Sequence, residues 1–104
     1  MENLFIYGTL INPYTQREIL GRRLEFSKDI LEDYEGSRVL IKECVHPAIF
    51  SKNGGSIEGF LTKVSEEELI IIDKYKGKKF ERARVQLKSG NEAFVYVGIS
   101  PQNL

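Results

Sequence analysis

Hydrophobic residues along the chain fall into short apolar runs separated by polar turns, a pattern typical of β-strands. Six such runs predict strands, over about residues 3–7, 24–32, 38–44, 57–64, 80–87 and 93–98. Residues 33–36 predict a bend between the second and third strands, and residues 53–55 and 89–91 predict hairpin turns. We therefore expect a β-meander to make up most of the chain.

Two segments instead carry helix signals with well-marked ends. Asn12 as N-cap and Pro13 at the first helical position predict a short helix that ends near Gly21. Ser65 followed three residues later by Glu68 forms a capping box, and Gly77 ends this second helix. Residues 69–72 are so apolar that we expect most of the second helix to be buried against the sheet.

Length and composition narrow the class of protein. The 104 residues predict a single domain over residues 1–104. Fifteen basic and fifteen acidic side chains cancel, which disfavours a nucleic acid or an anionic membrane as partner. A lone cysteine, Cys44, excludes an internal disulfide, and no leader or long apolar span precedes the first strand. A cytoplasmic location is the resulting expectation.

The most informative segment is Tyr7-Gly8-Thr9-Leu10, where an apolar strand runs directly into a glycine turn. Such a turn can direct backbone N–H groups at a small anion without interference from side chains. Further landmarks follow in order along the chain: Gly36-Ser37-Arg38, Pro47-Ala48, Gly59, Ile72-Asp73-Lys74-Tyr75-Lys76-Gly77, Phe80-x-Arg82 and Val95-Tyr96. In order and spacing, these landmarks resemble the γ-glutamyl cyclotransferase-like family, also called AIG2-like.

This resemblance implies an α+β fold, a small mixed β-barrel of about six strands with two short helices. It also implies a cavity whose floor is the glycine turn, and an activity that releases 5-oxoproline from γ-glutamyl amines or amides. The ligand-binding residues that it suggests are Tyr7, Gly8, Thr9, Leu10, Arg82 and Tyr96. No cofactor and no metal are expected.

The chemistry of this family identifies a residue that departs from its pattern. 5-Oxoproline forms when the α-amine of the substrate attacks its own γ-carbonyl, so a base must first remove a proton from the ammonium. In the family this base is the glutamate of Leu-Asp-x-Tyr-Glu-Gly, and the corresponding residue here is Lys76. A lysine with an ordinary pKa of about 10.4 is cationic at neutral pH and repels an ammonium.

Three interpretations of this position stay open. Lys76 is a solvated lysine at a helix C-terminus, or burial makes it a neutral base, or Asp73 replaces the missing glutamate and pairs with Lys76. Glu35 lies in a segment that imitates the missing motif but falls too early in the chain, and Glu81 is expected to face away from the cavity because it alternates with Phe80. Neither is a candidate base.

Two other groups of residues carry weaker signals. Cys44 and His46 lie two residues apart in an extended run, which could indicate a thiolate–imidazole pair. A small cysteine in the core is the simpler interpretation. The two residues also offer too few ligands to bind a metal ion. Residues 74–84 are rich in lysine and arginine, which suggests contact with an anion or a macromolecule. No stacking motif supports nucleic acid, so a solvated surface is the simpler interpretation.

The sequence therefore predicts a protein that binds a small γ-glutamyl or 5-oxoproline-type ligand without efficient catalysis of the family type. The alternative is an active cyclotransferase that uses Asp73 or a neutral Lys76 as its base.

Overall fold

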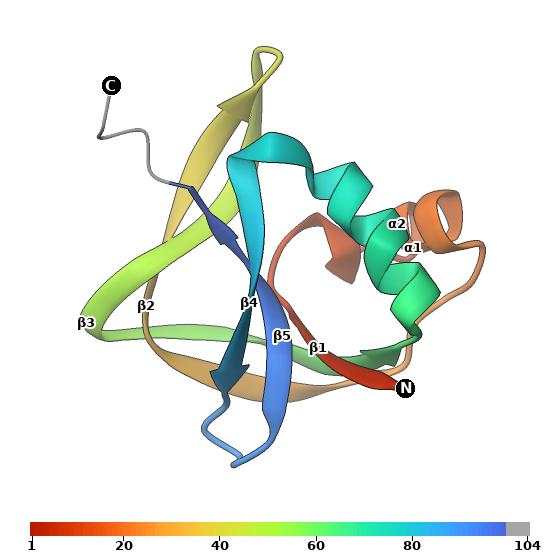
Figure 1. The fold of residues 1–104 in the computed structure, drawn as a ribbon. Helices are drawn as coiled ribbons and strands as arrows, with labels where there is room; N and C mark the ends of the chain where they lie inside the picture. Colours follow the sequence, from red (N-terminus) through yellow and green to blue (C-terminus); the bar gives the residue numbers. More distant parts are fainter. Residues whose placement is uncertain (100–104) are drawn as a thin grey trace.

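A curved five-stranded sheet with two helices on one side forms the structure, a computed structural model that describes residues 1–99 (Figure 1). In chain order, the elements are β1 (Glu2–Ile6), the 3-10 helix η1 (Thr9–Ile11), α1 (Pro13–Leu20), β2 (Phe26–Ile41), β3 (Cys44–Val64), α2 (Glu66–Lys76), the 3-10 helix η2 (Gly77–Lys79), β4 (Phe80–Gln86) and β5 (Glu92–Gly98). The strand order is β2-β3-β1-β5-β4, and only β1 and β5 pair in parallel. This arrangement confirms the predicted mixed α+β fold.

The strand boundaries differ from the prediction, because one pair of expected strands is continuous and β3 begins well before the expected strand at residues 57–64. The second and third predicted strands form the single strand β2, which pairs along its length with β3, so the described part of the chain has five strands and not six. The hairpin turn lies at Lys42 and Glu43, whose φ angles are +49° and +67°. Two successive positive φ angles give a turn whose twist matches that of its strands.

The glycine pair expected to form a hairpin turn forms a bulge within β3 instead. Residues 52–55 lie opposite Asp33 alone, and the register shifts between Glu32 and Tyr34. Asp33 has a φ of +70°, and its Oδ1 accepts a hydrogen bond of 3.1 Å from the N–H of Gly54. A bulge bends the sheet and increases its twist, which explains the sharp curvature of the β2–β3 hairpin in Figure 1.

The helix ends agree with the prediction. Asn12 Oδ1 accepts from the N–H of Tyr14, Gly21 ends α1 at a φ of +73°, and Ser65 and Glu68 form the capping box of α2. The expected burial of most of α2 is wrong, however. Leu69 and Ile72 are buried, whereas Ile70, Ile71 and Tyr75 are 54%, 44% and 38% exposed.

Both faces of the central strand β1 are buried, and a separate apolar cluster packs on each. Leu4 and Ile6 pack on the helix side, where Ile72 and Tyr96 belong to the same cluster, and Phe5 packs on the other side. The sheet curls until the N–H of Lys88, after β4, donates to the carbonyl of Ile30 in β2 at 2.8 Å. Within residues 1–99 no ladder joins β2 to β4, so the sheet is curled but not closed as the expected barrel would be.

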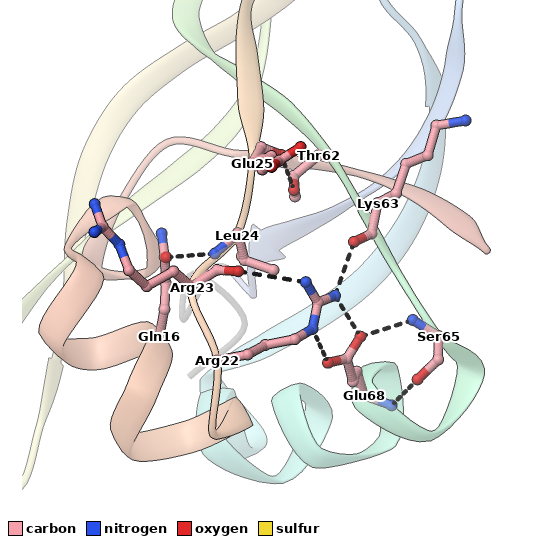
Figure 2. A network of polar contacts seen from close by, with 9 residues as sticks. All are labelled: Gln16, Arg22, Arg23, Leu24, Glu25, Thr62, Lys63, Ser65 and Glu68. Atoms are coloured by element: carbon pink, nitrogen blue, oxygen red, sulfur yellow. Dashed lines mark hydrogen bonds and ion pairs between the residues drawn. The ribbon is translucent and has the colours of Figure 1, made fainter.

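An ion pair ties the segment after α1 to the start of α2 (Figure 2). The Arg22 guanidinium donates to both carboxylate oxygens of Glu68, at 2.7 and 2.8 Å, and to the carbonyl of Lys63 at 3.2 Å. The same carboxylate accepts from the N–H of Ser65 as part of the capping box. Because Glu68 is mostly buried and Arg22 is about one-third exposed, we expect this bidentate pair to stabilise the packing of α2.

Replacing Glu68 by glutamine is expected to lower the free energy of unfolding by about 1 kcal/mol at pH 6, with a smaller effect in acid. The hydrogen bonds from Arg22 hold the pKa of Glu68 below its ordinary value. A lowered carboxyl pKa contributes stability above the unfolded-state pKa, and this contribution is lost as the pH falls through the lowered value. Urea unfolding at pH 6 and pH 3 measures the difference between the two proteins.

The matched control for this prediction is Glu67→Gln, because Glu67 is an exposed neighbour on the same helix turn. We expect this control to change stability little at either pH. A Glu68→Gln deficit of the same size at pH 3 and pH 6 would contradict the assignment of the effect to the ionised pair.

Candidate functional site

The turn formed by Tyr7, Gly8, Thr9 and Leu10 leads from β1 into η1 and leaves backbone donors free. The carbonyls of Gly8 and Thr9 accept hydrogen bonds from the N–H groups of Ile11 and Asn12, at 3.0 and 3.1 Å. The N–H groups of Gly8, Thr9 and Leu10 have no protein acceptor within residues 1–99. Three successive free N–H groups are suited to binding an oxygen atom of an anion or a carbonyl group.

The side chain of Gln16 in α1 holds this turn in place through hydrogen bonds to its backbone. This role was not predicted from the sequence. The side chain is 1% exposed. Its Nε2 donates to the carbonyl of Leu10 at 2.8 Å and to that of Ile11 at 3.4 Å. Its Oε1 accepts from the N–H of Leu24 at 2.8 Å (Figure 2). No sequence motif marks these contacts. A glutamine within an apolar helix face was the only available signal.

Lys76, the last residue of α2, directs its amine toward the glycine turn. The Nζ atom lies 4.5 Å from the centre of the Phe80 ring, 5.6 Å from that of Tyr7 and 5.9 Å from that of Tyr96. The ring faces attract the ammonium form, but burial penalises the charge and lowers the Lys76 pKa to about 8. Lys76 is therefore not the solvated lysine that one interpretation of the sequence expected.

The Lys76 side chain borders a small cavity at the turn, which we call the turn cavity. Its lining residues are Phe5, Ile6, Tyr7, Gly8, Leu10, Lys76 and Tyr96. The cavity measures about 10 Å³, which is room for about one water molecule. With Lys76 in this position, the turn cavity is too small for a γ-glutamyl group.

Asp73 is held away from Lys76 by other partners. Its carboxylate accepts a hydrogen bond of 2.5 Å from the Tyr96 hydroxyl and lies 3.4 Å from the Arg82 guanidinium. Within residues 1–99 no carboxylate lies within 4.0 Å of the Lys76 amine, so the expected ion pair with Asp73 does not form. Asp73 is not among the residues that line the turn cavity.

The hydroxyl groups of the two tyrosines that line the turn cavity also have hydrogen-bond partners. Tyr7 donates its hydroxyl proton to the carbonyl of Tyr96, and burial raises the pKa of Tyr7 above its usual range. Burial, and next the hydrogen bond to Asp73, raise the pKa of Tyr96 in the same direction. Both phenols are therefore neutral at physiological pH.

The structure brings together some of the predicted ligand-binding residues but not all. Tyr7, Gly8, Leu10 and Tyr96 line the turn cavity together with Lys76. Thr9 lies in the same turn, and its hydroxyl is 2.7 Å from that of Tyr75. Arg82 does not line the cavity, because its guanidinium packs on the Phe94 ring at 5.0 Å and pairs with Asp73.

An open groove of about 310 Å³ adjoins the turn cavity, with Tyr7 in both linings. Its lining residues are Tyr7, Gly36, Ser37, Arg38, Pro47, Ala48, Ile49, Ile57 and Glu58. Two sequence landmarks, residues 36–38 and 47–48, thus meet beside the turn. A larger groove of about 550 Å³ lies between β2, β3 and the β4–β5 turn, and it contains none of the predicted site residues.

The remaining candidates from the sequence lie apart from the turn cavity. Glu35 is exposed on β2. Cys44 is exposed next to the hairpin turn, so the expected core position of this cysteine is wrong. Among residues 1–99 no group of three His, Cys, Asp or Glu side chains could hold a metal ion. Of the described helices, none has the length and hydrophobicity needed to cross a membrane.

Comparison with known proteins identifies related sequences and structures. Residues 4–103 match the family described as "Gamma-glutamyl cyclotransferase, AIG2-like". The chain is 31% identical over 86 residues to Protein AIG2 C of Arabidopsis thaliana, an alignment that covers 82% of this chain and 51% of the relative. The chain therefore spans about half the length of this relative.

Solved structures agree with the fold. A protein of Arabidopsis thaliana with a known solution structure superimposes with a TM-score of 0.75 at 28% identity, covering 93% of this chain and 61% of the other. A structure named γ-glutamyl cyclotransferase superimposes with a TM-score of 0.71 at 18% identity, covering 95% and 67%. At this identity the second likeness shows the fold alone.

Proposed function

Because the chain belongs to the γ-glutamyl cyclotransferase, AIG2-like family, we propose that it binds a small ligand carrying a γ-glutamyl or 5-oxoproline group at the glycine turn. The ligand occupies the adjoining groove, and its carbonyl or carboxylate oxygen accepts from the free N–H groups of Gly8, Thr9 and Leu10. Turnover of the family type is inefficient because Lys76 stands in place of the glutamate base.

The observation that carries this proposal is the position of the Lys76 side chain, which lines the turn cavity with its amine 4.5 Å from the centre of the Phe80 ring. Free N–H groups and an ammonium in one partly buried site both favour a negatively charged oxygen. Arg38, in the lining of the adjoining groove, adds a second cation for a ligand carboxylate. These charges favour 5-oxoproline, which carries a carboxylate and no ammonium, over a γ-glutamyl amine with its own positive charge.

Family-type catalysis requires a proton acceptor for the substrate ammonium, and neither Lys76 in its cationic state nor Asp73 is available for this role. Lys76 is protonated below its pKa of about 8, and both oxygens of Asp73 already have partners. Binding a substrate ammonium beside the Lys76 ammonium costs free energy through repulsion. Acid–base help of the kind that is missing is typically worth about 10²–10⁴-fold in rate.

The alternative function is an active cyclotransferase in which the neutral amine of Lys76 is the base. The lowered pKa of Lys76 favours this alternative, because the neutral fraction becomes appreciable just above pH 7. The two functions differ in their pH dependence. An enzyme with this base releases 5-oxoproline at a rate that rises with pH and levels off above about pH 8.

Isothermal titration calorimetry with 5-oxoproline tests the proposed function. We expect the wild type to bind at pH 6.5, and we expect Lys76→Met to bind at least about tenfold more weakly, because methionine keeps the side-chain length but removes the cation. Lys74→Met is the matched control, since Lys74 is exposed on the same helix.

A parallel assay follows 5-oxoproline release from γ-glutamyl amines between pH 6 and pH 9. Absence of product together with 5-oxoproline binding supports the proposal. Efficient release that follows a single ionisation near pH 8 would establish the alternative enzyme instead.

A further inference from the structure

The outer face of α2 carries two large apolar side chains that remain accessible in the described part of the chain. Ile70 and Ile71 are each about half exposed, whereas Leu69 and Ile72, on the opposite side of the helix, are buried in the cluster between α2 and the sheet. A contiguous exposed apolar patch with polar residues at its edges is typical of a protein–protein contact surface.

A charged residue lies at each end of this pair of isoleucines. Glu67 precedes them and Lys74 follows them, at the spacing i, i+3, i+4 and i+7 that places all four residues on one side of a helix. We call residues 67, 70, 71 and 74 the α2 face. The two charges are separated by about 10 Å along the helix axis, and neither belongs to an ion pair within residues 1–99.

The α2 face is complementary to itself. When a second copy of α2 lies against it in the opposite direction, with a two-fold axis between Ile70 and Ile71, the four isoleucines meet at the centre. Glu67 of each copy then lies opposite the partner's Lys74, whereas parallel helices would place like charges together. Because a two-fold contact requires each residue to match the one that symmetry brings to it, we propose that two copies of this chain associate through antiparallel α2 faces.

This contact is separate from the candidate ligand site. Lys76, which lines the turn cavity, follows Lys74 by two residues and therefore lies on roughly the opposite side of the helix. The proposal therefore does not depend on the proposed function.

The size of the α2 face sets the expected strength of association. The helix has 11 residues and is about 16 Å long, whereas stable complexes bury about 1,200–2,000 Å² in total. We therefore expect a weak dimer, with a dissociation constant on the order of 100 µM. The unfolding comparison of Glu68→Gln with Glu67→Gln, made at low micromolar protein, accordingly measures the monomer.

Sedimentation equilibrium between about 10 µM and 1 mM protein measures this association. We expect the average mass of the wild type to rise from that of one chain toward that of two, and we expect Ile70→Gln to associate at least tenfold more weakly. Val45→Gln is the matched control, because Val45 on β3 is more exposed than either isoleucine and lies outside the α2 face. It should associate as the wild type does, and circular dichroism verifies that each variant is folded.

Reversing the charges tests the antiparallel arrangement. Glu67→Lys and Lys74→Glu each place like charges opposite each other, so each variant alone should associate at least tenfold more weakly than the wild type. An equimolar mixture of the two variants should regain association, because both ion pairs then form between unlike copies.

The proposal is overturned if the wild type stays monomeric up to about 1 mM, or if Ile70→Gln associates as strongly as the wild type. Loss of association in Val45→Gln would place the contact on another surface and overturn it as well. A mixture of the two charge variants that associates no better than either alone would contradict the antiparallel pairing. Failure of 5-oxoproline to bind would contradict the proposed function only, since sedimentation is measured without ligand.

Discussion

Lys76→Glu is expected to release 5-oxoproline from γ-glutamyl amines at least about 10²-fold faster than the wild type. The substitution places a carboxylate at the end of α2, in the lining of the turn cavity together with Gly8 and Leu10. A carboxylate accepts the proton of the substrate ammonium, and its negative charge attracts that ammonium where Lys76 repels it. Product formation over a panel of γ-glutamyl amines and dipeptides measures the gain.

Lys76→Gln is the matched control, because glutamine has the size of glutamate without the charge. We expect it to stay as slow as the wild type. Equal rates for Lys76→Glu and Lys76→Gln would show that the carboxylate is not what the site lacks. A wild type as fast as Lys76→Glu would show that it already has a base.

Gln16→Met is expected to lower the free energy of unfolding by about 3 kcal/mol, the largest stability effect that we predict for a single side chain. Methionine fills a similar volume but leaves the carbonyls of Leu10 and Ile11 and the N–H of Leu24 without their side-chain partner. Buried polar groups that lose a partner cost about 1–3 kcal/mol each. Urea denaturation followed by circular dichroism measures the loss.

Gln86→Met is the matched control for this substitution. Gln86 is exposed on β4, and its one hydrogen bond, to the carbonyl of Gly90, is long at 3.5 Å. We expect this control to change stability by less than about 0.5 kcal/mol. Gln16→Met should also weaken 5-oxoproline binding, because the turn loses its hydrogen bonds to Gln16. A Gln16→Met protein as stable as the wild type would contradict the role given to Gln16.

Local signals in the sequence were sufficient to predict the ends of the two helices and the position of the glycine turn. Asn12 and Ser65 cap helices through hydrogen bonds within three residues, so their effect can be read from neighbouring positions. The β2–β3 hairpin turn was missed because Lys42 and Glu43 adopt positive φ angles without the glycine or asparagine that usually indicates such a turn. The glycines at 54 and 55 were available for that turn but form a bulge opposite Asp33.

The candidate site was predictable only as far as its residues lie in one segment. Tyr7 to Leu10 are contiguous, and the sequence identified them together. The role of Gln16 depends on contacts with Leu10 and Leu24 that form only after α1 packs on the sheet. The sequence also left the position of Lys76 open, because its burial depends on Tyr7, Phe80 and Tyr96 from three different parts of the chain.

The most direct test of the central claim is an NMR titration of the lysine ¹³Cε resonances, with and without 5-oxoproline. We expect Lys76 to titrate near pH 8 and its resonance to shift when 5-oxoproline binds, while the Lys74 resonance is unchanged by the ligand. A Lys76 resonance that titrates at the ordinary value of a lysine, about pH 10.4, and that is unchanged by the ligand would contradict the placement of this amine in the ligand site.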